Sequence, residues 1–253
     1  MKRKQPARSG PAIIYGVHPV VETLKAGRRQ IQEIYLARDS FPQLNLNAQL
    51  EASQIPLVRV SGNELLSIAG SPNHQGLAAR VGPFPYVEFS DIVSTLALEQ
   101  RPILVLDAIQ DPANLGSILR SAECLGAAAV ILSKDRSVAV TPAVEKTSAG
   151  AAAHVPVAKV VNLVRAIEQL KESGCWVYGT DSEAKSVCFT TDLTGRLAFV
   201  LGSEGKGARR LVREKCDAMV SIPMTGSISS LNVSQAAAIL LAEALRQRMK
   251  VGR

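Results

Sequence analysis

The sequence predicts an α/β protein in which a small domain precedes a larger domain built on a mostly parallel sheet. From residue 101 onward, short apolar runs alternate with helical patterns, which is typical of buried parallel strands covered by helices on both faces. A length of 253 residues suits one large or two small domains. Pro83 and Pro85 can continue neither a helix nor a central strand, so we expect the domain boundary there.

The first domain is expected to cover residues 12–82, after a flexible basic tail at 1–11. A helix is predicted from His18 to Ala26, because Pro19 suits a first turn and Gly27 suits a helix end. Ser61 and Glu64 have the spacing of a capping box at the start of a further short helix. The other predicted elements are strands at 31–36, 57–60 and 76–81 and a helix at 43–53.

The second domain is expected at 101–253, after a linker and a first helix within 83–100. Its predicted strands are 103–106, 129–132, 155–157, 176–179, 197–201 and 219–222. Its predicted helices are 115–125, 142–152, 163–172, 208–215 and 233–249. Parallel sheets of this kind bind ligands at the loops that follow the strands, so those loops are the places to search for chemistry.

Composition excludes several classes of protein. Hydrophobic residues make up 47% and charged residues 20%, as in chains that bury a core, and no run approaches the eighteen apolar residues of a membrane span. The basic start has no cleavage pattern of a secretory signal, so we expect a cytoplasmic protein. Four cysteines and three histidines are widely scattered, which predicts buried thiols and neither a disulfide framework nor a metal site.

The charge points to a polyanionic partner. The formal net charge is +7, and basic residues cluster at 1–29 and 206–215. Either cluster alone could equally be a solvated surface. Only one Trp, four Tyr and five Phe are present, which argues against the exposed aromatic rows on which single-stranded nucleic acid stacks.

Three strand-to-helix junctions hold short polar or glycine-rich segments. The first contains Asn114, predicted as the helix N-cap, and Arg120, expected near the second turn. The second, 201–207, has three glycines whose spacing matches neither a dinucleotide-binding nor a Walker A loop. The third, 222–234, mixes hydroxyl and apolar side chains and suits a ligand with an apolar body and polar edges, such as an adenosine. Taken singly, each segment could be an ordinary cap or turn.

Together, and in this order, the segments resemble the three motifs of the SpoU (TrmH-type) family of RNA ribose 2'-O-methyltransferases, within the SPOUT class. The first motif is Asn114-x-Gly116-x-x-x-Arg120 and the second is Leu201-Gly202-x-Glu204-x-x-Gly207. The third is Ile222-Pro223-Met224-x-Gly226-x-x-x-Ser230-Leu231-Asn232-Val233-Ser234. Tyr15–Val20 and Asn73–Ala78 are similar to the RNA-binding amino-terminal module of those members that methylate a guanosine ribose in 23S ribosomal RNA.

The resemblance implies a fold, a cofactor and a partner. It implies a trefoil-knotted parallel-sheet domain after a small ribosomal-protein-like α/β module. It also implies S-adenosyl-L-methionine as cofactor, 23S ribosomal RNA as substrate, a homodimer, and no metal. By similarity the cofactor contacts Gly202, Ile222, Met224 and Leu231.

The same resemblance implies a catalytic set, for which it favours Arg120. A free guanidinium stays protonated in proteins, so we expect Arg120 to bind the target phosphate and to orient or polarise the hydroxyl, and to act as a base only if its charge is strongly perturbed. Glu204 is the rival base, although it could instead anchor its loop. Asn114, Ser230 and Asn232 suit the positioning of Arg120 or the ribose.

Several alternatives stay open at this point. The chain could methylate transfer RNA or another ribosomal nucleotide, or it could be a non-catalytic RNA-binding assembly factor on the same scaffold. A nucleotide-dependent oxidoreductase is disfavoured because the phosphate loop and its acidic ribose-binding partner are missing.

Overall fold

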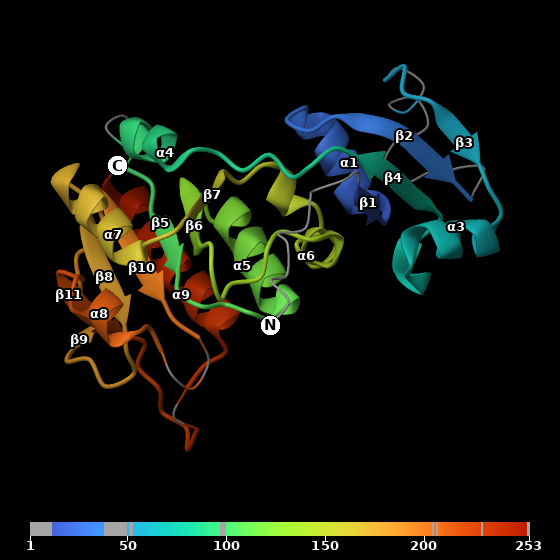
Figure 1. Cartoon of the computed structure of the whole chain (residues 1–253). Helices are drawn as coiled ribbons and strands as arrows, with labels where there is room; N and C mark the ends of the chain where they lie inside the picture. The colour runs from blue at the N-terminus through green and yellow to red at the C-terminus, as the bar shows by residue number, and fades with distance from the viewer. Residues whose placement is uncertain are drawn as a thin grey trace, which may run out of the picture. The chain divides into compact units, whose positions relative to one another are not determined.

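The computed structural model describes residues 12–37, 50, 53–96, 100–203, 205, 207–228 and 230–251. Within it the chain divides after Pro85 into two compact units, each described here by itself (Figure 1). The predicted tail at 1–11 lies outside the described residues, as does nearly all of the helix predicted at 43–53.

The first unit is a mixed sheet with a helix packed on each face. The strand order is β1-β4-β2-β3, in which β4 is antiparallel to β1 and β2, and β2 is parallel to β3. Its strands are β1 (Ala12–Tyr15), β2 (Ile31–Leu36), β3 (Leu57–Arg59) and β4 (Leu77–Val81). Its helices are α1 (Val17–Ala26), α3 (Gly62–Ala69) and the short 3-10 turn η2 (Pro72–His74).

Alternation along the strands creates two cores in this unit. Ile34 faces the α1 side with Val20 and Val21, whereas Tyr35 faces the α3 side with Leu65. The predicted capping box of α3 is confirmed. Ser61 Oγ accepts from the Glu64 amide at 3.2 Å, and Glu64 Oε2 accepts from the Ser61 amide at 2.7 Å. The prediction missed β1, whose four residues directly follow the basic tail.

The second unit is built on a seven-stranded sheet with the order β7-β6-β5-β10-β8-β11-β9. All of its neighbouring strands are parallel, which confirms the predicted sheet type. The strands are β5 (Ile103–Leu106), β6 (Ala129–Ser133), β7 (Val157–Val160), β8 (Trp176–Thr180), β9 (Ser186–Val187), β10 (Leu197–Leu201) and β11 (Ala218–Ser221). The bounds of the strand predicted at 155–157 are wrong, because β7 begins only at Val157. The strand β9 was not predicted.

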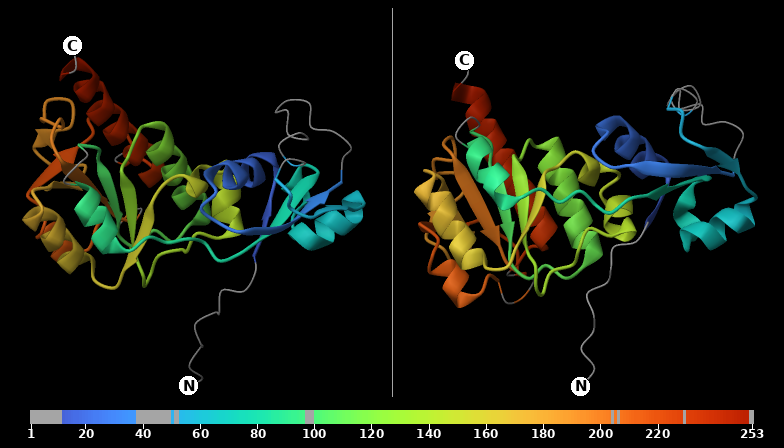
Figure 2. Two further views of the ribbon diagram at one scale, coloured as in Figure 1. Left: turned by 90° about the horizontal axis from the view of Figure 1, so that it is seen from above. Right: turned by 45° about the horizontal axis from the view of Figure 1, so that its top comes forward.

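Helices cover both faces of this sheet (Figures 1 and 2). They are α4 (Phe89–Leu96), α5 (Pro112–Cys124), α6 (Pro142–Thr147), η3 (Ala151–Ala153), α7 (Leu163–Glu172), α8 (Arg210–Arg213) and α9 (Val233–Val251). Ile92, Ile167 and Val212 of α4, α7 and α8 pack in one core with alternate residues of β5 and β6. On the opposite face α5 packs against α6 and α9. No described helix is both long and apolar enough to cross a bilayer.

Two helices differ from the prediction by three residues or more at one end, for local reasons. The helix α5 begins three residues early, because Asp111 rather than Asn114 is its N-cap and Pro112 occupies the first turn. The helix predicted at 142–152 stops at Thr147, because Ala149 (φ 52°) and Gly150 (φ 85°) adopt the left-handed conformation.

The strand order places a topological switch point at the centre of the sheet. Strands β5 and β10 are neighbours, but the chain leaves β5 through α5 toward β6 on one side and leaves β10 through α8 toward β11 on the other. Ligands of open parallel sheets bind where the connections diverge in this way. The loops after β5 and β10 are therefore where a site is expected.

Candidate functional site

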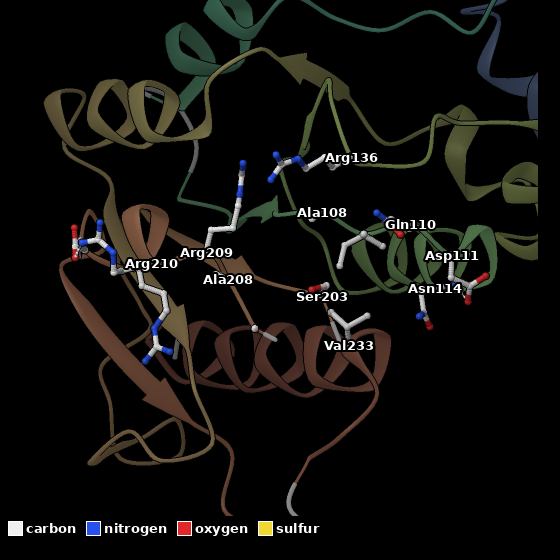
Figure 3. Close-up of a pocket in the computed structure, with 14 residues that line it drawn as sticks. Ala108, Gln110, Asp111, Asn114, Arg136, Ser203, Ala208, Arg209, Arg210 and Val233 are labelled. Atoms are coloured by element: carbon white, nitrogen blue, oxygen red, sulfur yellow. Dashed lines mark hydrogen bonds and ion pairs between the residues drawn. The ribbon is translucent and has the colours of Figure 1, made fainter. Parts of the chain in front are cut away.

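A large basic cleft lies at this switch point. It has a volume of about 800 Å³ and is formed by the loops after β5, β6 and β10 together with α8 (Figure 3). We call it the arginine cleft, because Arg136, Arg209, Arg210 and Arg213 line it. A concave surface with this many guanidinium groups suits a ligand rich in phosphate.

A smaller cavity of about 310 Å³ lies between the loops after β8, β10 and β11 and the start of α9. We call it the apolar cavity. Its apolar lining residues are Leu201, Val220, Ile222, Met224, Leu231, Val233 and Ala236. Polar side chains, among them those of Thr180, Ser203 and Ser230, also line it. This lining suits a small ligand with an apolar body and polar edges.

The two cavities share a wall. Ser203, Gly207, Arg213 and Val233 line both of them. A molecule in the apolar cavity and a molecule in the arginine cleft would therefore be neighbours. Such an arrangement can bring two reactants together in one geometry.

The wall depends on Gly202. A Cβ atom at this residue would lie 1.9 Å from both the Ala208 amide nitrogen and the Gly207 carbonyl carbon. The loop folds back this closely because the Gly207 amide donates to the Ser203 carbonyl at 2.9 Å, and because Gly205 (φ 76°) and Gly207 (φ 63°) are left-handed. Any side chain at Gly202 would push the wall out of place.

A buried carboxylate fixes the far end of the same loop. Asp107 directly follows β5 and is 0% exposed. It accepts hydrogen bonds from the Arg209 amide at 2.9 Å and from Arg209 Nε at 2.9 Å, and Nη2 of Arg209 lies 2.8 Å from its Oδ1. The Asp107 amide donates to the Leu201 carbonyl at 2.8 Å. This pair therefore ties the end of β5 to the loop between the two cavities.

A second link joins α5 to the segment before α9. Asn232 Nδ2 donates to Asn114 Oδ1 at 2.8 Å. Asn232 Oδ1 accepts from the Ser234 amide at 2.9 Å and from Ser234 Oγ at 2.6 Å, so Asn232 also caps α9. The prediction that Asn114 caps α5 is wrong, because its side chain faces Asn232 and Asp111 supplies the cap.

Comparison with known families decides what kind of site this is. The family model described as SpoU rRNA Methylase family matches residues 101–242, more than half of the chain. This chain belongs to the SpoU rRNA methylase family. A second model, described as RNA 2'-O ribose methyltransferase substrate binding, matches residues 13–87.

Close relatives in this SpoU family cover almost the whole chain. The 23S rRNA (guanosine-2'-O-)-methyltransferase RlmB of Vibrio cholerae is 43% identical over 243 residues, which are 94% of this chain and 97% of the relative. The protein of the same name from Escherichia coli is 41% identical over 239 residues, covering 93% of this chain and 98% of its own length.

Solved structures of SpoU enzymes have the same architecture. AviRb from Streptomyces viridochromogenes, crystallised with the cofactor AdoMet, superposes with a TM-score of 0.80 at 26% identity, covering 95% of this chain and 92% of that one. The crystal structure of an RNA 2'-O ribose methyltransferase gives 0.78 at 28% identity, with 95% and 90% covered.

The structure brings most of the SpoU motif residues together. Gly202, Ile222, Met224 and Leu231, the four expected cofactor contacts, all line the apolar cavity. Of the expected catalytic set, Ser230 lines the same cavity and Asn114 lines the arginine cleft, while Asn232 bonds to Asn114.

For two members of the expected catalytic set, the structure shows no place at the site. Arg120 is exposed on the third turn of α5, not the second as predicted, and is not among the residues that line either cavity. Glu204 lies outside the described residues. The roles of all these side chains in binding and catalysis stay predictions.

Three side chains of the site were not predicted. Asp107 could have been suspected, since it is an acid placed directly after a fully buried strand. Asp181 follows β8 and pairs with Arg213 beside the apolar cavity. Arg136 has no distinguishing pattern in the sequence, because its place depends on a left-handed backbone (φ 64°) in the loop after β6.

The cysteines lie away from this chemistry. Burial raises the pKa of the Cys175 thiol to about 12 and that of Cys216 to about 11, so both are protonated at neutral pH. The expectation of buried thiols is wrong for Cys124, which is exposed. Among the described residues, no three His, Cys, Asp or Glu side chains gather in a way that could hold a metal ion.

Proposed function

We propose that this chain transfers a methyl group from S-adenosylmethionine to the ribose 2'-OH of a guanosine in 23S ribosomal RNA. The observation that carries the proposal is the shared wall between an apolar cavity and an arginine cleft, in a member of the SpoU family. The RlmB relatives, at 41–43% identity over nearly the whole chain, support the choice of guanosine and 23S RNA. Because the proposed substrate is ribosomal RNA, the proposed place of action is the cytoplasm.

The apolar cavity fits the cofactor. Its volume of about 310 Å³ lies in the range of small-molecule sites, and Gly202 lets main chain form its wall with no side chain in between. Ile222, Met224 and Leu231 would cover an adenosine, and the hydroxyl groups would meet its polar edges. When bound, S-adenosylmethionine supplies an electrophilic methyl group on a sulfonium.

The residues of the chain then have three tasks. The arginine cleft binds the RNA backbone beside the shared wall. The Asn114–Asn232 pair, with Ser230, holds the ribose in line with the apolar cavity. Holding two reactants in such a geometry can contribute roughly 7–11 kcal/mol. The proton of the 2'-hydroxyl must also be accepted, and Arg120 and Glu204 remain the candidates for orienting the hydroxyl or taking its proton.

Calorimetry tests the cofactor half of the proposal. S-Adenosylmethionine is expected to bind and NAD is expected not to. Binding of NAD alone would overturn the assignment. Mapping of ribose methylation in ribosomal and transfer RNA, from cells with and without this protein, tests the substrate half. Loss of one 2'-O-methylguanosine in 23S RNA is expected, and loss only in transfer RNA would redirect the proposal to that substrate.

We also propose a homodimer in which Arg120 acts across the subunit interface. The support is that Arg120 is exposed on α5 and lines neither cavity of its own subunit, and that α5 packs beside α9. Two inactive proteins, Arg120→Ala and Gly202→Ala, would then complement each other. Refolded together, half of the dimers would carry one intact site, so about a quarter of wild-type activity is expected.

The outcome without complementation is equally clear. No activity above the separate variants would place Arg120 in its own subunit's site. Sedimentation as a monomer at micromolar concentration would overturn the dimer itself.

The trefoil knot and the ribosomal-protein-like character of the first unit belong to this proposal as well. Membership of the SpoU family supports the knot, and so does the way the loops after β8, β10 and β11 wall a single cavity. A knot is rare enough that strand and helix patterns do not predict it. A crystal structure tests the knot. When its chain path is drawn tight from both ends, a knotted path is expected to remain, and a path that straightens completely would contradict the knot.

A further inference from the structure

The arginine cleft contains two strained backbone positions. Ala108 (φ 60°) and Arg136 (φ 64°) are left-handed residues other than glycine, and both line the cleft. This conformation brings Cβ close to the following carbonyl group, so such residues are uncommon and cluster at functional sites. Two of them facing one cavity indicate that the cleft is held in its shape for a purpose.

Hydrogen bonds hold the strained loops in place. The Val138 amide donates to the Ile109 carbonyl at 2.8 Å, which joins the loop after β6 to the loop after β5. Ser133 Oγ donates to the Asp135 carbonyl at 2.9 Å and lies 2.6 Å from Ser137 Oγ. The loop is therefore fastened on both sides of Arg136. Its side chain extends into the cleft beside that of Arg209 (Figure 3).

Arg136 differs from the other arginines of the cleft in its charge balance. Arg209, Arg210 and Arg213 form ion pairs with Asp107, Glu214 and Asp181, respectively. The side chain of Arg136, by contrast, has no hydrogen-bond or ion-pair partner in the part of the chain that the structure describes. Among the described residues nothing compensates this guanidinium, and its backbone is strained where glycine would be less strained.

Arg209 supplies the neighbouring donor. Nε and Nη2 of its guanidinium are occupied by the buried Asp107 carboxylate, yet the side chain is 47% exposed. The pair with Asp107 holds this guanidinium rigidly while its outer edge faces the cleft. Planar guanidinium groups bind phosphate through two parallel N–H bonds, a geometry that a lysine cannot provide.

We propose that Arg136 and the outer edge of Arg209 together bind a backbone phosphate of the RNA next to the target nucleotide. This inference rests on the proposed function and assigns a binding residue outside the three SpoU motifs. The cleft adjoins the apolar cavity through Ser203 and Gly207, so a phosphate held there anchors the strand close to the methyl donor. Arg136 is in this sense an RNA-binding residue and takes no part in proton transfer.

The variant Arg136→Gly tests the inference, because glycine removes the guanidinium and adopts φ 64° without strain. We expect its melting temperature to rise. Its affinity for a 23S ribosomal RNA transcript is expected to fall about tenfold, and the slope of log K against log salt to become shallower by about one. Its calorimetric affinity for S-adenosylmethionine is expected to match the wild type, since Arg136 does not line the apolar cavity.

The matched control is Lys134→Ala. Lys134 lies in the same loop, is exposed and carries the same charge, but does not line the cleft. We expect less than a twofold change in RNA affinity for this variant, and Arg136→Lys is expected to fall between Arg136→Gly and the wild type.

Each other result overturns the inference. Wild-type RNA affinity in Arg136→Gly would remove Arg136 from the interface. Equal losses in Arg136→Gly and Lys134→Ala would reduce the effect to general charge. Lost affinity with a lower melting temperature would make Arg136 a structural residue. Failure of the wild-type protein to methylate or bind the transcript would overturn the proposed function itself. The wild-type measurement alone shows this, so it is distinguishable from failure of the inference about Arg136.

Discussion

The apolar cavity and the arginine cleft share a wall, yet they are built in different ways. The apolar cavity owes its shape to main chain, above all to the absence of a side chain at Gly202. The arginine cleft owes its shape to side-chain pairs such as Asp107–Arg209 and to loops held in a left-handed conformation. A cavity of the first kind is sensitive to added volume, and one of the second kind is sensitive to lost charge.

The largest expected effect on cofactor binding comes from Gly202→Ala. The new Cβ would lie 1.9 Å from main-chain atoms of Gly207 and Ala208, so the shared wall must move. We expect S-adenosylmethionine affinity, measured by calorimetry, to fall at least about 100-fold, which corresponds to roughly 2.7 kcal/mol. Gly195→Ala is the control, because Gly195 is exposed and a Cβ added there would meet no other atom within 4 Å. Unchanged affinity in Gly202→Ala would show that the loop adapts.

Removal of Arg209 is expected to destabilise the protein more than removal of its partner Asp107. Arg209→Ala leaves the fully buried Asp107 carboxylate without its guanidinium partner, and we expect a loss of about 3–5 kcal/mol in the free energy of unfolding. Asp107→Ala leaves a half-exposed guanidinium that water can reach, so about 1–3 kcal/mol is expected. Urea denaturation measures both. The reverse order would contradict the assignment of burial to the carboxylate.

Gly116→Ala is expected to disturb the cleft side while sparing the apolar cavity. A Cβ at Gly116 would lie 2.6 Å from Thr147 Cβ and 2.9 Å from the Val144 carbonyl oxygen, so α5 must shift on α6. We expect a destabilisation of about 1–3 kcal/mol. Methyl transfer should slow, because Asn114 moves with α5, while S-adenosylmethionine affinity stays close to wild type. Ser117→Ala on the same helix is the control, and equal effects of the two changes would argue against a specific contact at Gly116.

The smallest effect on stability is expected for Asn232→Asp. The aspartate keeps the oxygen that accepts from the Ser234 amide, and its charge suits the N-terminus of α9. It loses the N–H that donates to Asn114, a bond worth about 1 kcal/mol. We therefore expect a melting temperature near that of wild type but slower methyl transfer at saturating cofactor. Asn114→Asp keeps the acceptor of this bond and is expected to be milder, so a greater loss in that variant would refute the link.

The sequence predicts the parts of the fold that depend on local pattern. Strands 31–36, 103–106 and 197–201 were predicted to the residue. The last two are fully buried apolar runs with polar or turn residues at both ends, which leave little choice of strand bounds. The helix at 142–152 was overextended, since Ala149 is a good helix former by propensity and is left-handed only in its tertiary setting. The cap of α5 was misplaced because two good capping residues, Asp111 and Asn114, compete within one turn.

The two cavities of the site also differ in how far the sequence predicts them. Most of the residues that line the apolar cavity belong to the motifs at 201–207 and 222–234, so a resemblance could point to them. The arginine cleft could not be assembled from the sequence, because its pairs join distant segments: Asp107 with Arg209 and Asp181 with Arg213. The position of the Arg136 side chain depends on a left-handed backbone conformation that the neighbouring residues do not predict.

The Asp107–Arg209 pair also bears on how the protein is made. The two residues are 102 positions apart in the chain. During synthesis the Asp107 carboxylate has left the ribosome long before its guanidinium partner exists, so β5 cannot be buried in its final form until β10 and α8 have followed it. Pairing over such distances slows folding. A nascent chain halted before Arg209 is therefore expected to hold a folded first unit and an unfinished second one, which limited proteolysis of stalled chains would reveal.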